Sequence, residues 1–371
     1  MTKILVIGGG FGGISVASKL CKSGLDLDTI LIDKKETSDF LPMLPDCIGR
    51  DINPEFLNHK IDNIGKKMGF KFIREEVVSI DLEKRQASTK TLSLNYDYLV
   101  IASGSETNFY GNENIRQNAY ALDDAVDVKK LMHTLSQNEF DNFIIGGGGY
   151  TGIEVATNLR VYLDKAGRKS KIMIVERAPA ILGPLPEWIK NYVSDNLKEL
   201  NIEVCLNCTI EKIDGHSVNL SGGRNLNSAL VIWAAGVETA GFIQGLKLEK
   251  NPQGRIKVDE YLRINNNCFA VGDAALFTYG RGFLRMAVQF AIAQGECVAQ
   301  NIIKSIKVEP LKKFMPQDSG YIIPMANNRS CGTVLGLNFK GFLPTALHFL
   351  MCIYRSYGMK NKLGIVRDLI K

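Results

Sequence analysis

The chain has 371 residues, which is more than one ordinary hydrophobic core holds, so we expect two or three domains. Its composition, 45% hydrophobic and 23% charged, excludes an intrinsically disordered chain. The formal charge of +6 comes without a long Lys/Arg block, which argues against nucleic-acid binding, and eight cysteines are too few for a disulfide scaffold, which favours a reducing, cytoplasmic compartment.

Short apolar segments, predicted to be buried strands, alternate with helical patterns along most of the chain. They cover residues 3–7, 30–32, 98–102, 143–145, 171–175, 230–233 and 268–271. Because they are apolar on both faces, as parallel strands covered by helices are, we predict an α/β fold with right-handed crossovers. The first strand begins without an apolar leader, so no signal peptide is expected, and no segment reaches the roughly 20 apolar residues that span a bilayer.

The first strand runs into a glycine-rich loop, GGGFGG at residues 8–13. Gly8, Gly10 and Gly13 match the G-x-G-x-x-G pattern of dinucleotide sites. The first glycine makes a tight turn, the second lets the backbone approach a pyrophosphate, and the third lets the helix pack close to the strand. Asp33 ends the next strand, 20 residues after Gly13, where a carboxylate is expected to bind ribose hydroxyls.

The same pattern returns as GGGYTG at residues 147–152, and Glu176 ends the following strand, 24 residues after Gly152. A single copy can be an ordinary glycine-rich turn, but two copies in the same context predict two dinucleotide sites. Gly272-Asp273 follows the strand at 268–271 and offers an acid that could accept a hydrogen bond from a ribityl hydroxyl of a flavin. An ordinary N-cap aspartate would give the same pattern.

Together these motifs resemble those of the FAD-dependent pyridine nucleotide-disulfide oxidoreductases, and among them the type II NADH dehydrogenases, which are non-pumping NADH:quinone oxidoreductases. The resemblance extends to about residue 305 and includes FLPML at 40–44, YDYLVIASGS at 96–105 with Ser103 in place of the family's Thr, TGIE at 151–154 and WAAGV at 233–237. It implies two Rossmann-like domains: an FAD domain from residues 1–110 and 238–305, and an inserted NADH domain from 111–237. Residues 306–371 form a separate C-terminal segment.

The resemblance also assigns site residues. Glu154 is expected near the nicotinamide and the flavin, where it would help proton delivery; a carboxylate in the first helical turn, favoured by the helix dipole, is the alternative. Gln289 is expected to face the quinone, or else to lie near the flavin carbonyl without an acceptor role. Residues expected to bind non-covalent FAD or NADH are Gly8, Gly10, Phe11, Gly12, Gly13, Asp33, Lys34, Pro42, Val77, Ala102, Ser103, Gly104, Gly147, Gly149, Tyr150, Thr151, Gly152, Glu176, Ala235, Gly236, Gly272, Asp273 and Gln289.

NADH is expected in preference to NADPH, because Glu176 would bind ribose hydroxyls and repel a 2′-phosphate. Arg177 next to it could instead pair with that phosphate. The electron acceptor is expected to be a quinone: in MAVQFAIAQG at 286–295, Gln289 matches the first of the family's two glutamines, Ala293 stands where the second would be, and Gln294 precedes the glycine.

Other acceptors stay open, namely a thiol or sulfide handled by Cys47 or Cys331, or a small electron-carrier protein. A non-catalytic redox flavoprotein is a further alternative. The region where disulfide reductases carry a cysteine pair holds Cys47 alone. Cys205 and Cys208 are predicted to lie in one strand on opposite faces, which opposes a disulfide or a shared metal. The four histidines are dispersed, so no metal is expected.

The C-terminal residues 341–371 carry five positive charges and one negative charge. The apolar run at 342–354 is too short to span a membrane. Leu363, Val366 and Ile370 lie at helical spacing on one face, so we predict an amphipathic segment that binds an anionic membrane surface, peripherally and on the cytoplasmic face. Docking on the FAD domain or in a homodimer interface is the alternative.

Overall fold

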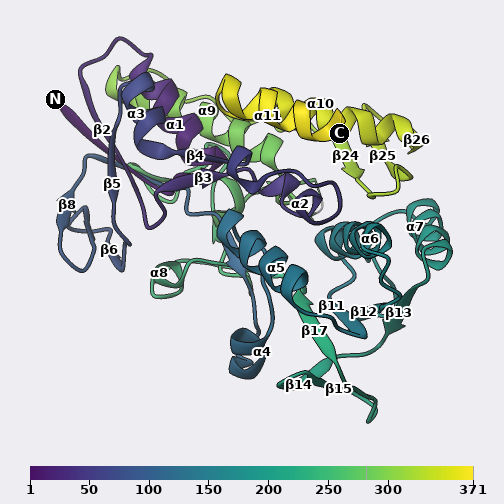
Figure 1. Cartoon of the computed structure of the whole chain (residues 1–371). Coiled ribbons are helices and arrows are strands. Elements are labelled where there is room, and N and C mark those ends of the chain that lie inside the picture. The colour runs from purple at the N-terminus through teal and green to yellow at the C-terminus, as the bar shows by residue number, and fades with distance from the viewer. Residues whose placement is uncertain (281, 371) are drawn as a thin grey trace. The chain divides into compact units, whose positions relative to one another are not determined.

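The computed structural model describes residues 1–280 and 282–370, in which the chain forms two compact units (Figure 1). Unit 1 combines Met1–Ser38, His59–Glu106 and Val237–Asp318, and unit 2 combines Asp39–Asn58, Thr107–Gly236 and Ser319–Lys371. The chain passes from unit 1 to unit 2 between Glu106 and Thr107, and back to unit 1 between Gly236 and Val237. The structure differs at the C-terminus, because residues 306–318 pack in unit 1 whereas Ser319–Lys371 belong to unit 2.

Unit 1 contains a five-stranded parallel sheet in the order β20-β9-β1-β2-β5. The apolar side chains at residues 4–7 of β1 and 99–101 of β9 are almost fully buried, as the apolar pattern predicted. Helices α1 and α9 approach closely, since a Cβ on Gly295 of α9 would lie 2.6 Å from the carbonyl oxygen of Gly12 in α1. The elements are β1 (Thr2–Ile7), α1 (Phe11–Cys21), β2 (Leu27–Asp33), α3 (Ile61–Met68), β5 (Lys71–Arg74), β9 (Tyr98–Ile101), β20 (Cys268–Ala270) and α9 (Val288–Ile306).

Unit 2 repeats this architecture with a four-stranded parallel sheet in the order β13-β12-β11-β17. Side chains from the sheet and from helices of this unit form one buried apolar cluster that includes Phe143, Leu159 and Ile174. The elements are α5 (Ala125–Gln137), β11 (Asn142–Gly146), α6 (Tyr150–Lys165), β12 (Lys171–Glu176), α7 (Glu187–Glu199), β13 (Ile202–Leu206) and β17 (Ala229–Trp233). The predicted α/β class with two Rossmann-like units is thereby confirmed.

Smaller elements complete both units. In the first half of the chain they are β3 (Thr37–Asp39), η1 (Leu41–Met43), α2 (Asp46–Gly49), η2 (Pro54–Phe56), β4 (Asn58–Lys60), β6 (Ser79–Asp81), β7 (Gln86–Ser88), β8 (Ser93–Asn95), β10 (Ser105–Thr107) and α4 (Glu113–Asn118). In the second half they are β14 (Ile210–Asp214), β15 (Ser217–Leu220), β16 (Asn225–Leu226), β18 (Val237–Thr239), α8 (Gly241–Gln244), β19 (Ile256–Lys257), η3 (Gly272–Ala274), β21 (Ala275–Leu276), β22 (Thr278–Tyr279) and β23 (Gly282–Phe283).

The C-terminal stretch of unit 2 is an antiparallel sheet of β24 (Gly320–Ile323), β25 (Ser330–Val334) and β26 (Leu337–Gly341), followed by α10 (Phe342–Arg355) and α11 (Met359–Ile370), the yellow end of the chain in Figure 1. Pro344 falls in the first turn of α10, where a missing N–H breaks no helical bond. Within residues 1–280 and 282–370, no helix is both long and apolar enough to cross a bilayer.

Helix α11 docks on residues 53–58 through its small and polar face. Gly364 lies against the ring of Phe56, which a Cβ would approach to 2.6 Å. Asn361 donates from Nδ2 to the Asn58 carbonyl at 2.8 Å, and Asp368 accepts from the Asn53 N–H at 3.2 Å. The opposite face, with Leu363 and Ile370, is exposed, as the predicted amphipathic pattern requires. Lys371, the last residue of the predicted basic cluster, lies outside the described residues.

Candidate functional site

The first glycine loop of unit 1 forms a cradle. Backbone atoms lie close to Gly8 and Gly13, whereas the space beside Gly10 is open. Gly8 has a φ of +110°, and a Cβ there would lie 2.2 Å from the Ala102 carbonyl oxygen. A Cβ on Gly13 would lie 1.9 Å from the Gly8 oxygen. Gly10 is different, because a Cβ there would meet nothing within 4 Å. The first and third glycines are therefore required by the fold, whereas the second leaves the backbone free to approach a ligand.

Asp33 closes the far side of this cradle at the end of β2. Its Oδ2 accepts from the Gly9 N–H at 2.6 Å, and its Oδ1 accepts from the Lys35 N–H at 2.7 Å. Neighbouring Lys34 forms an exposed ion pair with Glu106 at 3.0 Å. The acid predicted to bind a ribose is thus placed at the glycine loop by two backbone hydrogen bonds.

Asp273 and its neighbours form a second polar group in unit 1. Asp273 accepts from the Ser105 hydroxyl at 2.7 Å. Burial raises the pKa of Asp273, while Ser105 and Arg255 oppose that shift. The Ser103 hydroxyl is buried without a hydrogen-bond partner. Because unpaired buried hydroxyls are costly, an orphaned Ser103 beside an open glycine cradle fits a polar ligand such as FAD.

The second glycine loop, in unit 2, reproduces the first in detail. Gly147 has a φ of +105°, and a Cβ on Gly152 would lie 1.9 Å from the Gly147 oxygen. Gly149, like Gly10, has nothing within 4 Å of its Cβ position. Glu176 accepts from the Gly148 N–H and from the Ala178 N–H, each at 2.7 Å. The repeat seen in the sequence is therefore also a repeat of structure, and in both loops a carboxylate accepts a hydrogen bond from a loop N–H.

Tyr110, Ala235 and Gly236 lie together on unit 2. The Tyr110 hydroxyl donates to the Ala235 carbonyl at 2.8 Å, and a Cβ on Gly236 would lie 2.4 Å from that hydroxyl. The Arg177 guanidinium lies 5.8 Å from the Tyr110 ring centroid. This cation–π contact holds Arg177 against Tyr110, whereas Glu176 is held at the glycine loop.

Glu154 lies on α6, which begins at Tyr150 and has no acidic residue in its first turn. The expectation that Glu154 belongs to the first turn is wrong, because the helix begins four residues earlier, so the helix-dipole alternative loses its main support. Burial raises the pKa of Glu154 to about 8, with His348 lowering it and Asp46 raising it. Glu154 therefore carries its proton at neutral pH.

Gln289 is the second residue of α9 in unit 1. Its Nε2 donates to Asp318 Oδ1 at 3.1 Å, and Arg285 donates to the same oxygen at 2.6 Å. Gln294, by contrast, is buried and accepts from the Gly272 N–H at 2.7 Å. Gln294 thus supports the turn that carries Asp273. Of the two glutamines at 289 and 294, Gln289 is the one on the first turn of α9.

The other predicted binding residues lie in both units. Phe11, Gly12, Val77, Ala102 and Gly104 belong to unit 1, and Tyr150 and Thr151 open α6 in unit 2. Pro42 lies in η1, which belongs to unit 2 although the motif was expected within the first part of the FAD domain. No local sequence pattern indicated that residues 39–58 belong to unit 2.

The prediction that Cys205 and Cys208 lie on opposite faces of one strand is wrong. Strand β13 ends at Leu206, and Asn207 has a φ of +51°, which turns the chain. The two thiols contact each other: the pKa of Cys205 is raised to about 11 by burial and then by hydrogen bonding to Cys208. Across the described residues, no cluster of three or more His, Cys, Asp or Glu side chains could hold a metal ion.

Cys47 and Cys331, the candidate thiols of an alternative reductase, are both fully buried. Burial raises the pKa of Cys331 to about 12 and holds that of Cys47 well above its ordinary value. Because the thiolate is the reactive form, both side chains are poor nucleophiles, and neither supports thiol chemistry.

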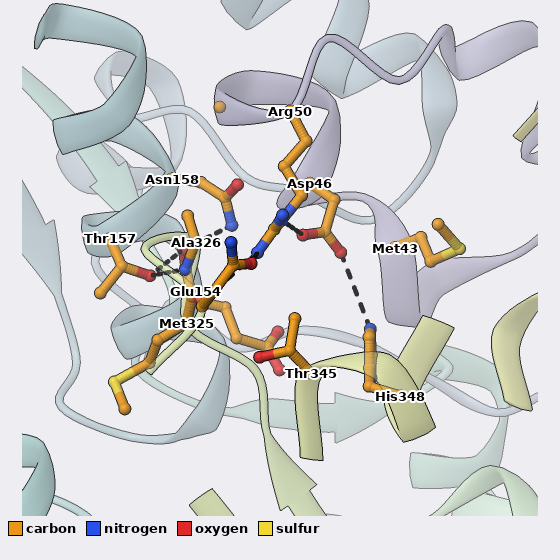
Figure 2. A network of polar contacts seen from close by, with 12 residues as sticks. Met43, Asp46, Arg50, Glu154, Thr157, Asn158, Met325, Ala326, Thr345 and His348 are labelled. Atoms are coloured by element: carbon orange, nitrogen blue, oxygen red, sulfur yellow. Dashed lines mark hydrogen bonds and ion pairs between the residues drawn. The ribbon is translucent and has the colours of Figure 1, made fainter. Parts of the chain in front are cut away.

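Figure 2 shows a group of charged residues around Glu154 in unit 2 that the sequence motifs did not predict. Asp46 of α2 and His348 of α10 form an ion pair at 3.7 Å, and Arg50 Nε lies 3.3 Å from the other Asp46 oxygen. Asp46 directly follows Pro45, which comes after the FLPML motif at 40–44, and His348 interrupts an apolar run. Each residue alone is a polar side chain beside an apolar stretch, but nothing in the sequence indicates that the two meet.

Comparison with known proteins agrees with this geometry. Residues 2–295 match the family described as pyridine nucleotide-disulphide oxidoreductase. A type II NADH:quinone oxidoreductase of Staphylococcus aureus is 27% identical over 367 residues, covering 91% of each chain. The structure of NDH2 from Plasmodium falciparum in complex with NADH has a TM-score of 0.87 at 19% identity, covering 100% of this chain and 98% of that one. The sulfide:quinone oxidoreductase of Aquifex aeolicus has a TM-score of 0.82 at 21% identity, covering 98% and 92%.

Proposed function

The chain belongs to the pyridine nucleotide-disulphide oxidoreductase family, and within it we propose that the chain is an FAD-dependent NADH dehydrogenase that reduces a quinone without proton pumping. The observation that carries this proposal is the pair of matching cradles, each with an open second glycine and an acid bound to its loop. The name of the Staphylococcus aureus relative supports quinone as the acceptor. When bound, FAD supplies the redox chemistry, accepting a hydride from NADH and passing two electrons to the acceptor.

The residues of the chain would bind and orient the two nucleotides and donate a proton to the acceptor. The Gly8–Gly13 loop and Asp33 would hold the FAD pyrophosphate and ribose, and Asp273 with Ser103 would bind further polar groups of FAD. The Gly147–Gly152 loop and Glu176 would hold NADH. Glu154, protonated at neutral pH, is the proposed proton donor, and Gln289 the proposed contact for a quinone.

We expect kcat/KM for NADH to exceed that for NADPH by at least about tenfold, because a carboxylate that faces a 2′-phosphate costs at least ~1.4 kcal/mol. Glu176 is the source of this discrimination, since it is held at the loop, whereas Arg177 is held against Tyr110. Glu176→Ala should therefore bring the kcat/KM values for NADH and NADPH closer together. Steady-state rates with both nucleotides check this, and equal kcat/KM values in the unmodified protein would contradict it.

Gln289→Leu should slow quinone reduction by roughly tenfold, the cost of about one hydrogen bond to the acceptor, while reduction by NADH stays near its original rate. The two half-reactions are measured separately by rapid mixing. Gln300→Leu, on the same helix, is the matched control and should change neither rate. If Gln289→Leu slowed only the NADH step, Gln289 would belong to the nicotinamide side.

The C-terminal helices are proposed to hold the protein on the cytoplasmic face of an anionic membrane. Leu350 of α10 is 63% exposed and Leu363 of α11 is 62% exposed, so apolar side chains face outward on both helices. Basic residues lie among them. Further exposed apolar residues of these helices are Phe342, Leu343, Met351, Tyr354, Met359 and Ile370.

Deleting residues 341–371 would not test this anchor, because α10 and α11 also pack into unit 2 through buried residues such as Phe349 and Ile365. The double substitution Leu350→Asp/Leu363→Asp should lower co-sedimentation with anionic vesicles at least tenfold, since each exposed leucine can contribute about 1.5–3 kcal/mol when buried in lipid. Val126→Asp, at a residue that is 70% exposed on α5, is the matched control. Unchanged sedimentation, or a dimer that the double substitution dissociates, would exclude the anchor.

A further inference from the structure

A buried ion pair joins two separate stretches of chain in unit 2, and helix α6 packs against one of them. Asp46 lies on α2 and is 5% exposed, and His348 lies on α10 and is 10% exposed. Helix α2 is fixed against α6, because a Cβ on Gly49 would lie 2.4 Å from the Asn158 carbonyl oxygen. In Figure 2 the Glu154 side chain of α6 points toward α10, on which Thr345 and His348 lie.

Asp46 is held in place by Arg50, one helical turn further along the chain. Arg50 lies 3.3 Å from one Asp46 oxygen and donates to the Asn328 side chain at 2.9 Å. The Arg50 guanidinium also lies 4.8 Å from the ring centroid of Phe349 on α10. These contacts leave the other Asp46 oxygen directed at His348 (Figure 2), so the carboxylate is a fixed partner for an imidazolium.

The surroundings of His348 favour its charged form. Burial alone lowers the pKa of His348, but the Cys352 sulfur, 3.6 Å from Nε2, and the Asp46 carboxylate outweigh it and raise that pKa well above its ordinary value. The charged form is thus present at low pH and persists as the pH rises past the ordinary histidine pKa, until it is lost at the raised value.

The two members of the pair act on Glu154 in opposite directions. Burial raises the pKa of Glu154 to about 8, His348 opposes this rise, and Asp46 adds to it. Without His348, both remaining influences would favour the protonated carboxyl. A proton donor that must lose and regain its proton in each turnover needs a pKa near the working pH, so His348 keeps Glu154 within that range.

We propose that His348, held in place by the buried carboxylate of Asp46, is the positioning residue that allows Glu154 to release and regain its proton near neutral pH. This inference rests on the proposed role of Glu154 as proton donor. The net reaction converts NADH, one proton and a quinone into NAD⁺ and a quinol. The hydride of NADH supplies both electrons and one of the two protons of the quinol, and Glu154 gives the other proton and then regains one from solvent. The Asp46–His348 pair itself gains and loses nothing.

The other cations named on these elements, among the residues that the structure describes, each interact with a different partner. Arg50 is paired with Asp46, Lys165 of α6 donates to the Gly49 carbonyl and to Asp51, and Lys340 of β26 interacts with Cys331. Titratable groups on the elements that pack around the pair include Asp46, Cys47 and Arg50 on α2, Glu154 and Lys165 on α6, Cys331 on β25, Lys340 on β26, and His348 and Cys352 on α10.

The first test is the pH profile of quinone reduction by the FAD-loaded protein. The unmodified protein should lose activity as the pH rises through about 8. His348→Asn should move this alkaline limb upward by about one pH unit, because an opposite charge near a carboxyl shifts its pKa by about 1–3 units. His133→Asn, at an exposed residue of α5, is the matched control and should leave the limb unchanged.

The double substitution Glu154→Gln/His348→Asn separates this role from simple docking of α10. If His348 acts through Glu154, His348→Asn should change nothing further once Glu154 is Gln. A further loss in that background, or an unshifted limb in His348→Asn alone, overturns the inference. A Glu154→Gln protein with unchanged quinone reduction would instead overturn the proposed role of Glu154, so the two failures are distinguishable.

A second readout needs no activity and no substitution at His348. The chain has four histidines, so ¹⁵N-histidine labelling gives four sets of imidazole signals, which His59→Asn, His133→Asn and His216→Asn assign by elimination. The signals of His348 should remain those of an imidazolium above the ordinary histidine pKa, and Asp46→Asn should lower the pH at which the proton is lost. A neutral His348 at pH 7 in the unmodified protein would overturn the inference.

Discussion

Gly10→Val is expected to abolish FAD binding while unit 1 stays folded. A Cβ at Gly10 meets no atom within 4 Å, so the first carbon of the valine side chain clashes with no protein atom. It occupies the open side of the cradle, where the backbone must approach a pyrophosphate. A steric conflict on the order of 3 kcal/mol lowers the affinity at least about 100-fold. The flavin absorbance that remains after gel filtration measures the loss, and circular dichroism checks the fold.

Gly149→Val is the matched variant of the second loop, because its Cβ position is equally open. It should keep full flavin and lose NADH affinity by a similar factor. Gly13→Val gives the opposite control, since a Cβ there would lie 1.9 Å from the Gly8 oxygen and should unfold unit 1. Full flavin content in Gly10→Val, or flavin loss in a folded Gly149→Val, would contradict the assignment of the loops.

Glu154→Gln should slow quinone reduction on the order of 100-fold, the usual contribution of a general acid. The carboxyl is protonated below a pKa of about 8, so donor activity is present at neutral pH and falls as the pH rises through that value. Glutamine has no proton to give, so the variant should also lose this alkaline limb. Rates of quinone reduction across pH, with reduction by NADH measured separately, check both effects.

Asp164→Asn, at an exposed residue of the same helix, controls for a general effect of removing a carboxylate from α6. It should leave both the rate and the pH profile unchanged. A Glu154→Gln protein that retained the alkaline limb would show that another group titrates there. One that lost only reduction by NADH would place Glu154 with nicotinamide binding instead.

The strands and the glycine loops could be predicted because their signals are local. An apolar segment followed by closely spaced glycines has few folded solutions, and the acids at positions 33 and 176 follow at short range. The structure explains why the glycines of each loop are not equivalent. The third glycine of each loop, Gly13 or Gly152, abuts a backbone oxygen. The second, Gly10 or Gly149, faces open space.

The Asp46–His348 pair could not be predicted in this way, because its members lie in distant parts of the sequence and meet through tertiary packing of α2 and α10. The placement of Ser319–Lys371 in unit 2 likewise depends on long-range contacts, such as Asn361 with Asn58. The error at Cys205 and Cys208 has a local cause, since one residue, Asn207, adopts a positive φ inside an otherwise strand-like pattern.

The central claim is that one chain takes electrons from NADH and delivers them to a quinone through bound FAD. Sequential anaerobic mixing tests it most directly: the FAD-loaded protein is mixed first with stoichiometric NADH and then with a quinone, and the flavin absorbance is followed. The proposal predicts a fall in absorbance with NADH and a full return with quinone, both faster than the steady-state turnover. No fall with NADH, or a return with thiol or sulfide acceptors but not with any quinone, would contradict it.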